Sequence, residues 1–248
     1  MDFVNALKME LKKSEITLGY NKDEQLIIDI EKNPSIIITG STGTGKSILL
    51  DQILLQLMNK YTSLEMGIVS IDTSGIELLS YTKTPYTLFH ALNDKTKSSE
   101  AIFKVLREIE RRKELLEEKK VLNVEDYNRI SSKKLPMLVL AIDDDKLLLR
   151  DKDIDSMLSG IITQLRDLNI VCILATSDVY NSFFETDKNI LASVLISFDY
   201  TSNDEATRAN IDGINNLPIG SFAAKINGVS KIYNNYEFDD STIEEIIK

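Results

Sequence analysis

The residues of this sequence with the clearest chemical potential lie in one glycine-rich stretch, IIITGSTGTGKSILL, at positions 36–50. The stretch contains the pattern G-x-x-x-x-G-K-S between a β-branched run and an apolar-periodic run, which predicts a strand, a loop and a helix in succession. Glycines let such a loop turn with its N–H groups pointing inward, and the following helix N-terminus adds partial positive charge. We therefore expect a phosphate-binding loop. A glycine-rich turn without a ligand is the alternative, and the flanking elements favour the phosphate site.

Each position of the loop has an expected role at a bound nucleotide. The side chain of Lys46 should reach the β- and γ-phosphates of ATP, and the hydroxyl of Ser47 should bind Mg²⁺. The residues expected to bind the nucleotide are Gly40, Ser41, Thr42, Gly43, Thr44, Gly45, Lys46 and Ser47.

A second group of candidate residues, Asp143, Asp144 and Asp145, follows the apolar run MLVLAI. A strand that ends in aspartate can orient the water molecules of a phosphate-bound metal, so we expect Asp143 to support Mg²⁺ together with Ser47. Asp144 stands where a catalytic carboxylate would polarise the attacking water. It is one methylene shorter than glutamate, which predicts hydrolysis slowed on the order of a hundredfold. We expect Asp145 to cap the following segment.

Ser177 follows the apolar run 170–176, where a polar sensor of the γ-phosphate could act in catalysis. An ordinary loop serine is an equally good interpretation. Fast ring ATPases also need an arginine from the adjacent subunit to stabilise the transition state. Arg166 and Arg208 are available for such a role, but the sequence marks neither of them as this arginine.

Apolar runs that alternate with helical periodicities predict an α/β fold, with a mainly parallel sheet covered by helices on both faces. We expect strands at 66–72, 137–142, 170–176 and 191–198, helices at 46–61, 98–120 and 153–168, two short strands within 15–30, and an amphipathic helix within 1–13. Asn227-Gly228 between two apolar runs predicts an antiparallel hairpin over 220–233. We expect one domain over 1–248, with an N-terminal helix and strand extension (1–33), a phosphate-loop core (34–200), and a C-terminal hairpin and tail (201–248).

Four other notable residues are expected to be structural. His90, the only histidine, lies away from every predicted strand end, and Cys172, the only cysteine, lies in an apolar run. Arg111 and Arg112 belong to a charged run of the helix 98–120, which predicts a solvated face with ion pairs between successive turns.

The 248 residues carry 39 acidic and 29 basic side chains, which gives a formal net charge of −10. This charge disfavours DNA or an anionic lipid surface as a partner, although a local basic patch could override it. A single cysteine cannot form a disulfide framework within the chain, which favours a reducing compartment. No apolar run approaches the ~18 residues of a membrane-spanning helix.

Six motifs follow one another along the chain: Leu18-Gly19, ITGSTGTGKS, IDTSGIELL, EIERRKELLEEKKVLNVEDYN, LPMLVLAIDD and LRDLNIVCILATS. Their order resembles the FtsK/SpoIIIE motor ATPases over nearly the whole chain. Glu110-Arg111-Arg112 followed at a distance by Tyr127-Asn128 is a feature that a generic phosphate-loop protein would not show. The resemblance implies a RecA-like fold that works in ring or tandem ATPases, some of which pump DNA while others drive protein secretion.

Departures from the DNA-motor pattern indicate a branch of this family. The chain has Asp143-Asp144 where the motors have Asp-Glu, Thr176-Ser177 where they have Thr-Gln, and no arginine in NILASVLISF. These features resemble the C-terminal ATPase module of the EssC/EccC coupling proteins of type VII secretion. That resemblance implies a piece of a larger, membrane-anchored protein with tandem modules, of which the distal ones are often degenerate.

We therefore expect an ATP- and Mg²⁺-binding module of a secretion motor at the cytoplasmic face of the cell membrane, with weak or absent intrinsic hydrolysis. The resemblance implies neighbouring ATPase modules of the same polypeptide and small helical WXG100-like substrates as partners, and contact with the membrane only through the parent protein. One alternative is an active DNA translocase or conjugative coupling ATPase. Another is a cargo receptor that does not need nucleotide.

Overall fold

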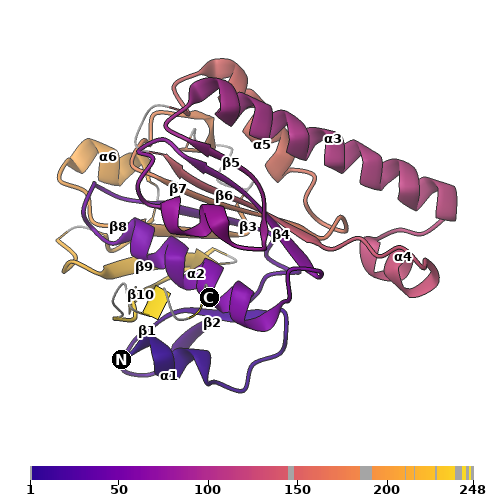
Figure 1. Ribbon diagram of the computed structural model, residues 1–248. Helices are drawn as coiled ribbons and strands as arrows, with labels where there is room; N and C mark the ends of the chain where they lie inside the picture. The colour runs from indigo at the N-terminus through magenta and orange to yellow at the C-terminus, as the bar shows by residue number, and fades with distance from the viewer. Residues whose placement is uncertain are drawn as a thin grey trace.

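The apolar runs of the sequence form strands that pair into one sheet in the computed structural model (Figure 1). The strands are β1 (Glu15–Tyr20), β2 (Gln25–Asp29), β3 (Ser35–Thr39), β4 (Met66–Asp72), β5 (Thr87–Leu92), β6 (Met137–Asp144), β7 (Ile170–Thr176), β8 (Val194–Phe198), β9 (Ser221–Ile226) and β10 (Val229–Asn234). Their order in the sheet is β2-β1-β10-β9-β8-β3-β7-β6-β4-β5. The structure describes residues 2–144, 148–184, 192–209, 211–214, 216–226, 228–237, 242–243 and 246.

The helices flank this sheet. They are α1 (Phe3–Leu7), α2 (Lys46–Lys60), α3 (Lys95–Lys119), α4 (Val124–Ile130), α5 (Lys152–Ile162) and α6 (Asn203–Arg208), with short 3-10 helices η1 (Leu79–Lys83) and η2 (Ser182–Phe184). Among the described residues, no helix combines the length and the apolar character that a membrane span requires.

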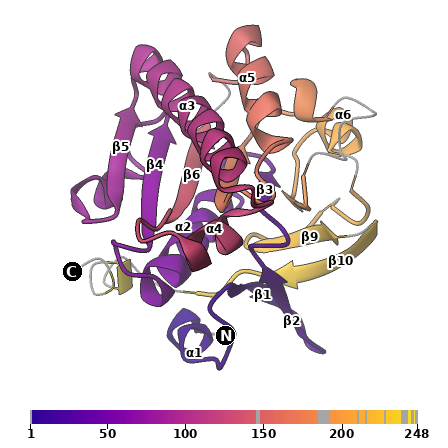
Figure 2. The same cartoon turned by 90° about the vertical axis from the view of Figure 1, so that its right-hand side faces the viewer.

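The central strands are buried on both faces, and their side chains alternate between the two faces. On β3, Ile36 and Ile38 pack in the core that contains α1 and α2, whereas Ile37 packs in the opposite core with α3, α4 and α5. Figures 1 and 2 show these helices on the two sides of the sheet. Burial on both faces explains why the central strands read as continuous apolar runs.

The sheet has a parallel and an antiparallel part. Strands β8, β3, β7, β6, β4 and β5 run parallel to one another. Strand β9 pairs antiparallel with β8, and β10, β1 and β2 continue the antiparallel part. The predicted α/β fold, its mainly parallel core and its C-terminal hairpin are therefore confirmed, although Asn227 of the expected turn lies outside the described residues.

Several boundaries differ from the sequence-based expectation. Helix α5 ends at Ile162 instead of continuing to 168, and Asp167 and Asn169 in the following turns adopt left-handed backbone angles. The N-terminal helix is restricted to Phe3–Leu7. Strand β5 and helix α4 were not predicted. In β5 the side chains of Leu88 and His90 are exposed, so this edge strand lacks the apolar run of a buried one.

The expectation that Arg112 is solvated is wrong, since its side chain is only 2% exposed. Its guanidinium donates hydrogen bonds to the backbone carbonyls of Pro136 (2.8 Å), Leu168 (2.6 Å) and Asn169 (3.0 Å), and to the Glu108 carboxylate (2.7 Å). These carbonyls precede β6 and β7, so Arg112 ties α3 to the start of both strands.

Asn128, which belongs to the same family-like motif, has a related role. Its side chain exchanges two hydrogen bonds with the backbone of Leu135, at 2.7 and 3.0 Å. The amide therefore fixes the segment that leads from α4 into β6. Both Arg112 and Asn128 hold backbone that precedes the buried strands, which gives this motif a structural role.

Replacing Arg112 with methionine should lower the free energy of unfolding by about 3–5 kcal/mol, because several buried acceptors lose their partner. Urea denaturation of the purified protein measures this change. The matched control is Arg111→Met, since Arg111 also pairs with Glu108 but is half-exposed. It should cost less than about 1 kcal/mol. Equal effects of the two variants would contradict the structural role of Arg112.

Candidate nucleotide-binding site

The predicted site residues come from strands whose carboxyl ends meet at one edge of the sheet. Thr39 at the end of β3 is in register with Thr176 of β7, which is in register with Asp144 of β6. Asp143 of β6 is in turn in register with Asp72 of β4. Ligands of open α/β sheets bind at such an edge, so the topology brings the phosphate loop and the carboxylates to the same place.

The phosphate loop has the backbone that its glycines predict. Gly40, Gly43 and Gly45 have φ angles of +140°, +80° and +118°. At Gly40 a Cβ atom would also lie 2.7 Å from the Cβ of Phe198, so both the backbone angle and the packing require glycine there. Gly45 is the N-cap of α2. It has no side chain that could compete with a phosphate for the N–H groups of the first turn.

The lysine of the loop is held against the loop itself. The Nζ atom of Lys46 donates a hydrogen bond to the carbonyl of Ser41 at 3.0 Å, and the hydroxyl of Thr44 donates to the same carbonyl at 2.7 Å. Thr42 and Gly43 are exposed at the tip. The ammonium group is therefore part of the surface that the loop would present to phosphates.

Asp143 is brought next to the phosphate loop. Its carboxylate accepts a hydrogen bond from the Ser47 hydroxyl, and its side chain is 8% exposed. The second oxygen, Oδ2, is buried and has no hydrogen-bond partner among the described residues. The pKa of Asp143 is raised from 3.8 to about 6, mainly by burial and also by the carboxylates of Glu77 and Asp72, against the effects of Ser47 and Lys46.

This pair of oxygen donors fits Mg²⁺, which prefers oxygen ligands and keeps several of its water molecules. The buried, unpaired oxygen of Asp143 is the acceptor that such a water molecule would satisfy. No group of three or more His, Cys, Asp or Glu side chains within the described part of the chain could hold a metal unaided. A metal here would therefore take its remaining ligands from nucleotide phosphates and water.

Asp144 is not brought to the phosphate loop in the same way. Asp143 and Asp144 face opposite sides of β6. Asp144 is on the same side as Ile142, which packs in the core of α3 and α5. Its buried carboxylate accepts hydrogen bonds from the backbone N–H groups of Leu148 (2.8 Å) and Leu149 (3.4 Å). Asp144 thus organises the segment after β6, the function that we expected of Asp145, which lies outside the described residues.

The remaining candidates occupy different positions. Ser177 is buried directly after β7, at the same edge of the sheet as the phosphate loop. Arg166 precedes β7 and therefore lies toward the opposite edge. Arg208 ends α6, where its guanidinium lies 4.6 Å from the centroid of the Tyr180 ring and forms an ion pair with Asp204.

The C-terminal hairpin braces the phosphate loop, a contact that the sequence did not predict. The N–H of Gly220 donates to the Thr44 carbonyl at 3.1 Å, and the side chain of Asn235 donates to the Gly45 carbonyl at 3.0 Å. The N–H of Asn235 also donates to the carbonyl of Gly220 at 2.7 Å. Gly220 precedes β9 and Asn235 follows β10, so both ends of the hairpin support the loop.

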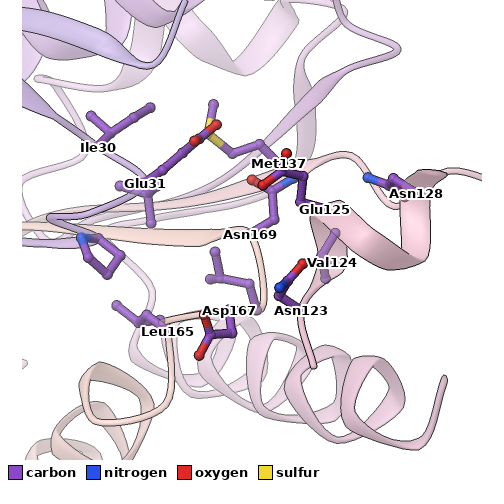
Figure 3. Close-up of a pocket in the computed structure, with 13 residues that line it drawn as sticks. Ile30, Glu31, Asn123, Val124, Glu125, Asn128, Met137, Leu165, Asp167 and Asn169 are labelled. Atoms are coloured by element: carbon purple, nitrogen blue, oxygen red, sulfur yellow. The ribbon is translucent and has the colours of Figure 1, made fainter. Parts of the chain in front are cut away.

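A separate cavity of about 350 Å³ lies at the opposite edge of the sheet (Figure 3). Pro34, Met137 and Ile170, which precede or begin β3, β6 and β7, contribute to its lining. Glu31 and Asp167 also line it. Because this cavity is at the amino ends of the strands, it is separate from the phosphate loop.

Comparison with known sequences identifies the family of the chain. The sequence profile of the FtsK/SpoIIIE family matches residues 5–178. The DNA translocase FtsK of Campylobacter jejuni is 30% identical over 173 residues, which cover 66% of this chain and 18% of that protein. The chain thus spans about a fifth of the length of this curated relative.

Comparison with solved structures supports the same fold. ATPases 2 and 3 of EssC from Geobacillus thermodenitrificans superpose with a TM-score of 0.80 at 20% identity, over 94% of this chain and 47% of that chain. The cytoplasmic domain of the Type VII secretion ATPase EccC from Thermomonospora curvata gives a TM-score of 0.82 at 18% identity, over 100% of this chain and 34% of that chain. These similarities show the RecA-like fold of a phosphate-loop ATPase.

The raised pKa of Asp143 predicts a pH-dependent effect of Asp143→Asn. The folded protein binds the Asp143 proton more tightly than the unfolded chain does, so this group lowers stability as pH rises from about 4 to about 6. The asparagine variant lacks this loss. Its free energy of unfolding relative to wild type should therefore grow by about 1–3 kcal/mol over that interval.

Urea denaturation at pH 4 and at pH 6 measures the difference. The control is Asp23→Asn at an exposed turn position, which should change the unfolding free energy by less than about 0.5 kcal/mol at either pH. A difference between Asp143→Asn and wild type that stays constant across the interval would contradict the prediction.

Proposed function

Because this chain belongs to the FtsK/SpoIIIE family, we propose that it is an ATP-binding module of a secretion motor with weak or absent intrinsic hydrolysis. One observation carries the proposal. The phosphate loop and the Ser47–Asp143 pair are intact, whereas the neighbouring Asp144 is engaged by the backbone of Leu148 and Leu149. We propose that the site keeps the parts that bind nucleotide, and that Asp144 does not act at the reacting phosphate.

Nucleotide binding follows from the geometry of the loop and of α2. Backbone N–H groups of the loop and of the first turn of α2 would bind the phosphates, and Lys46 would contribute the positive charge. Ser47 and Asp143 are the residues that would hold Mg²⁺. When bound, this ion neutralises charge on the β- and γ-phosphates.

Hydrolysis needs a group that orients the attacking water within hydrogen-bonding distance. The two backbone donors on Asp144 hold its carboxylate in the core-facing position. Ser177 is buried at the adjacent strand end, and we propose that it contacts the γ-phosphate side of the site as a sensor. With Asp144 so engaged, the module would turn ATP over slowly.

Nucleotide would act mainly on the shape of the module. The phosphate loop is hydrogen-bonded to Gly220 and Asn235 at the two ends of the hairpin, so ordering the loop would also order this part of the sheet. We propose that this stabilises packing on neighbouring ATPase modules of the same polypeptide.

Three observations favour the secretion branch over DNA translocation. The net charge of −10 opposes binding to a polyanion. The Asp-Asp and Thr-Ser pairs also depart from the DNA-motor pattern, and the similar EccC structure is that of a Type VII secretion ATPase. We propose small helical secreted proteins as substrates and a position at the cytoplasmic face of the cell membrane, reached through a parent protein.

The second candidate function is that of an active DNA translocase. Its support is the sequence similarity to FtsK of Campylobacter jejuni, which is named a DNA translocase. Because the chain spans about a fifth of that relative, the activity of the whole protein is a proposal in either case.

The binding half of the proposal is tested with Lys46→Ala. Loss of a charged hydrogen-bond donor to phosphate should weaken ATP binding by at least about tenfold in titration calorimetry. It should also remove the rise in melting temperature that excess ATP gives the wild type. The control is Lys119→Ala at the exposed end of α3, which should leave both quantities unchanged. Unchanged affinity in Lys46→Ala would refute nucleotide binding at this loop.

The branch of the family is tested by phosphate release with and without duplex DNA on the same sample. We expect ATP binding with slow turnover that DNA does not change. DNA-stimulated turnover would show that the chain is a DNA motor and that its net charge is misleading. The same assay on Asp144→Asn should give an unchanged rate if the Asp144 carboxylate is structural.

A further inference from the structure

The two ends of the C-terminal hairpin contact two successive peptide groups of the phosphate loop. The N–H of Gly220 donates a hydrogen bond to the carbonyl of Thr44 at 3.1 Å, and the Nδ2 atom of Asn235 donates to the carbonyl of Gly45 at 3.0 Å. The N–H of Asn235 also donates to the carbonyl of Gly220 at 2.7 Å, which joins the two contacts. The hairpin therefore holds these two loop carbonyls on its own side of the loop.

The positions of these carbonyls determine where the next two N–H groups point. Both peptide groups are trans, and in a planar trans peptide the C=O and N–H bonds point in opposite directions. The N–H groups of Gly45 and Lys46 therefore point away from the hairpin. Gly45 is the N-cap of α2 and Lys46 is its first residue, and N–H groups at a helix N-terminus are those that a bound phosphate would contact.

The glycines of the loop make this external support important. Gly43 and Gly45 have φ angles of +80° and +118°, and glycine has an unusually wide choice of backbone conformations. A binding group that already has its bound orientation loses less conformational freedom when the ligand arrives. The hydrogen bonds from the hairpin restrict the loop before any phosphate is bound, which favours phosphate binding.

The amide group of Asn235 is not explained by folding stability. The side chain is 8% exposed, and its Oδ1 atom is buried without a hydrogen-bond partner among the described residues. A buried polar atom without a partner lowers stability. The carbonyl of Gly45 does not depend on Asn235 either, because it also accepts the N–H of Leu49 at 3.1 Å. An apolar side chain of the same size would therefore suit the fold at least as well.

We propose that Asn235 is a positioning residue of the nucleotide site, which orients N–H donors of the phosphate loop through the carbonyl of Gly45. It acts through the backbone of the loop and does not itself touch the phosphates. This inference rests on the proposed function, because it requires a nucleotide at the phosphate loop. It makes nucleotide affinity depend on a residue that follows β10, far from the loop in the sequence.

The test is Asn235→Leu, which removes the donor and the unpaired oxygen and nearly keeps the size of the side chain. Calorimetry gives the dissociation constants of ATP and ADP, and both should rise by about five- to tenfold, the scale of one hydrogen bond. The two losses should be equal, because loop N–H groups bind the α- and β-phosphates that both nucleotides share. The melting temperature without nucleotide should not fall.

The matched control is the same substitution one residue earlier. The amide of Asn234 accepts a hydrogen bond from the Ser221 hydroxyl at 2.8 Å and donates to the carbonyl of Tyr20 at 3.4 Å, so it joins β10 to β9 and β1. Asn234→Leu should lower the melting temperature and keep the ATP affinity within about twofold of wild type. Asn235→Ala, which also lacks the donor, provides the affinity measurement if leucine prevents folding.

An ATP affinity within about twofold of wild type in the Asn235 variants, less than one hydrogen bond contributes, would overturn the inference and leave the proposed function standing. An equal loss of affinity in Asn234→Leu would also overturn it, because the stability of the hairpin would then explain the effect. Absence of ATP binding by the wild type would overturn the proposed function and this inference together.

Discussion

The alternation of side chains along β6 is the constraint on which the arrangement of the site depends. Consecutive residues of a strand face opposite sides of a sheet, so the two aspartates that end β6 cannot both face the phosphate loop along the strand. Asp143 faces α2 and contacts Ser47, while Asp144 faces the core of α3 and α5 and binds the backbone after β6. The polar end of one strand is thereby divided between a ligand site and the packing of the segment that follows.

Placing Asp143 at the ligand site lowers the folding stability of the protein. A carboxylate with a buried, unpaired oxygen is disfavoured in the folded protein until a cation or a water molecule satisfies it. Such a group lowers the stability of the protein alone and favours the complex with metal and nucleotide. Destabilised groups of this kind are typical of functional sites, where stability is lower than packing alone would allow.

The sequence predicted the elements whose signals are local. β4 and β7 have the predicted bounds because both are buried on both faces and read as unbroken apolar runs. The glycine spacing likewise predicted the loop, and the strand–Asp pattern predicted the pairing of Ser47 with Asp143.

Edge strand β5 was missed because its exposed residues break the apolar run. Arg112 was misassigned, since nothing in a run of charges distinguishes the one arginine that faces backbone carbonyls. Asn235 was missed because it meets the phosphate loop only in the fold, about 190 residues after Gly45.

The contacts of the last strands also determine when the nucleotide site can form during synthesis. The loop at 40–47 is translated early, but its carbonyls are bonded to Gly220 and Asn235, which leave the ribosome much later. Strand β1 also depends on residues that are synthesised late. It pairs with β10, and the Thr17 hydroxyl is hydrogen-bonded to the Tyr236 hydroxyl at 2.7 Å. A nascent chain that has emerged only as far as β8 therefore has a phosphate loop without its brace and a sheet with an unpaired inner edge. The hairpin supplies the contacts of the loop and the missing strand together, so the loop cannot have its observed contacts until β10 has been synthesised.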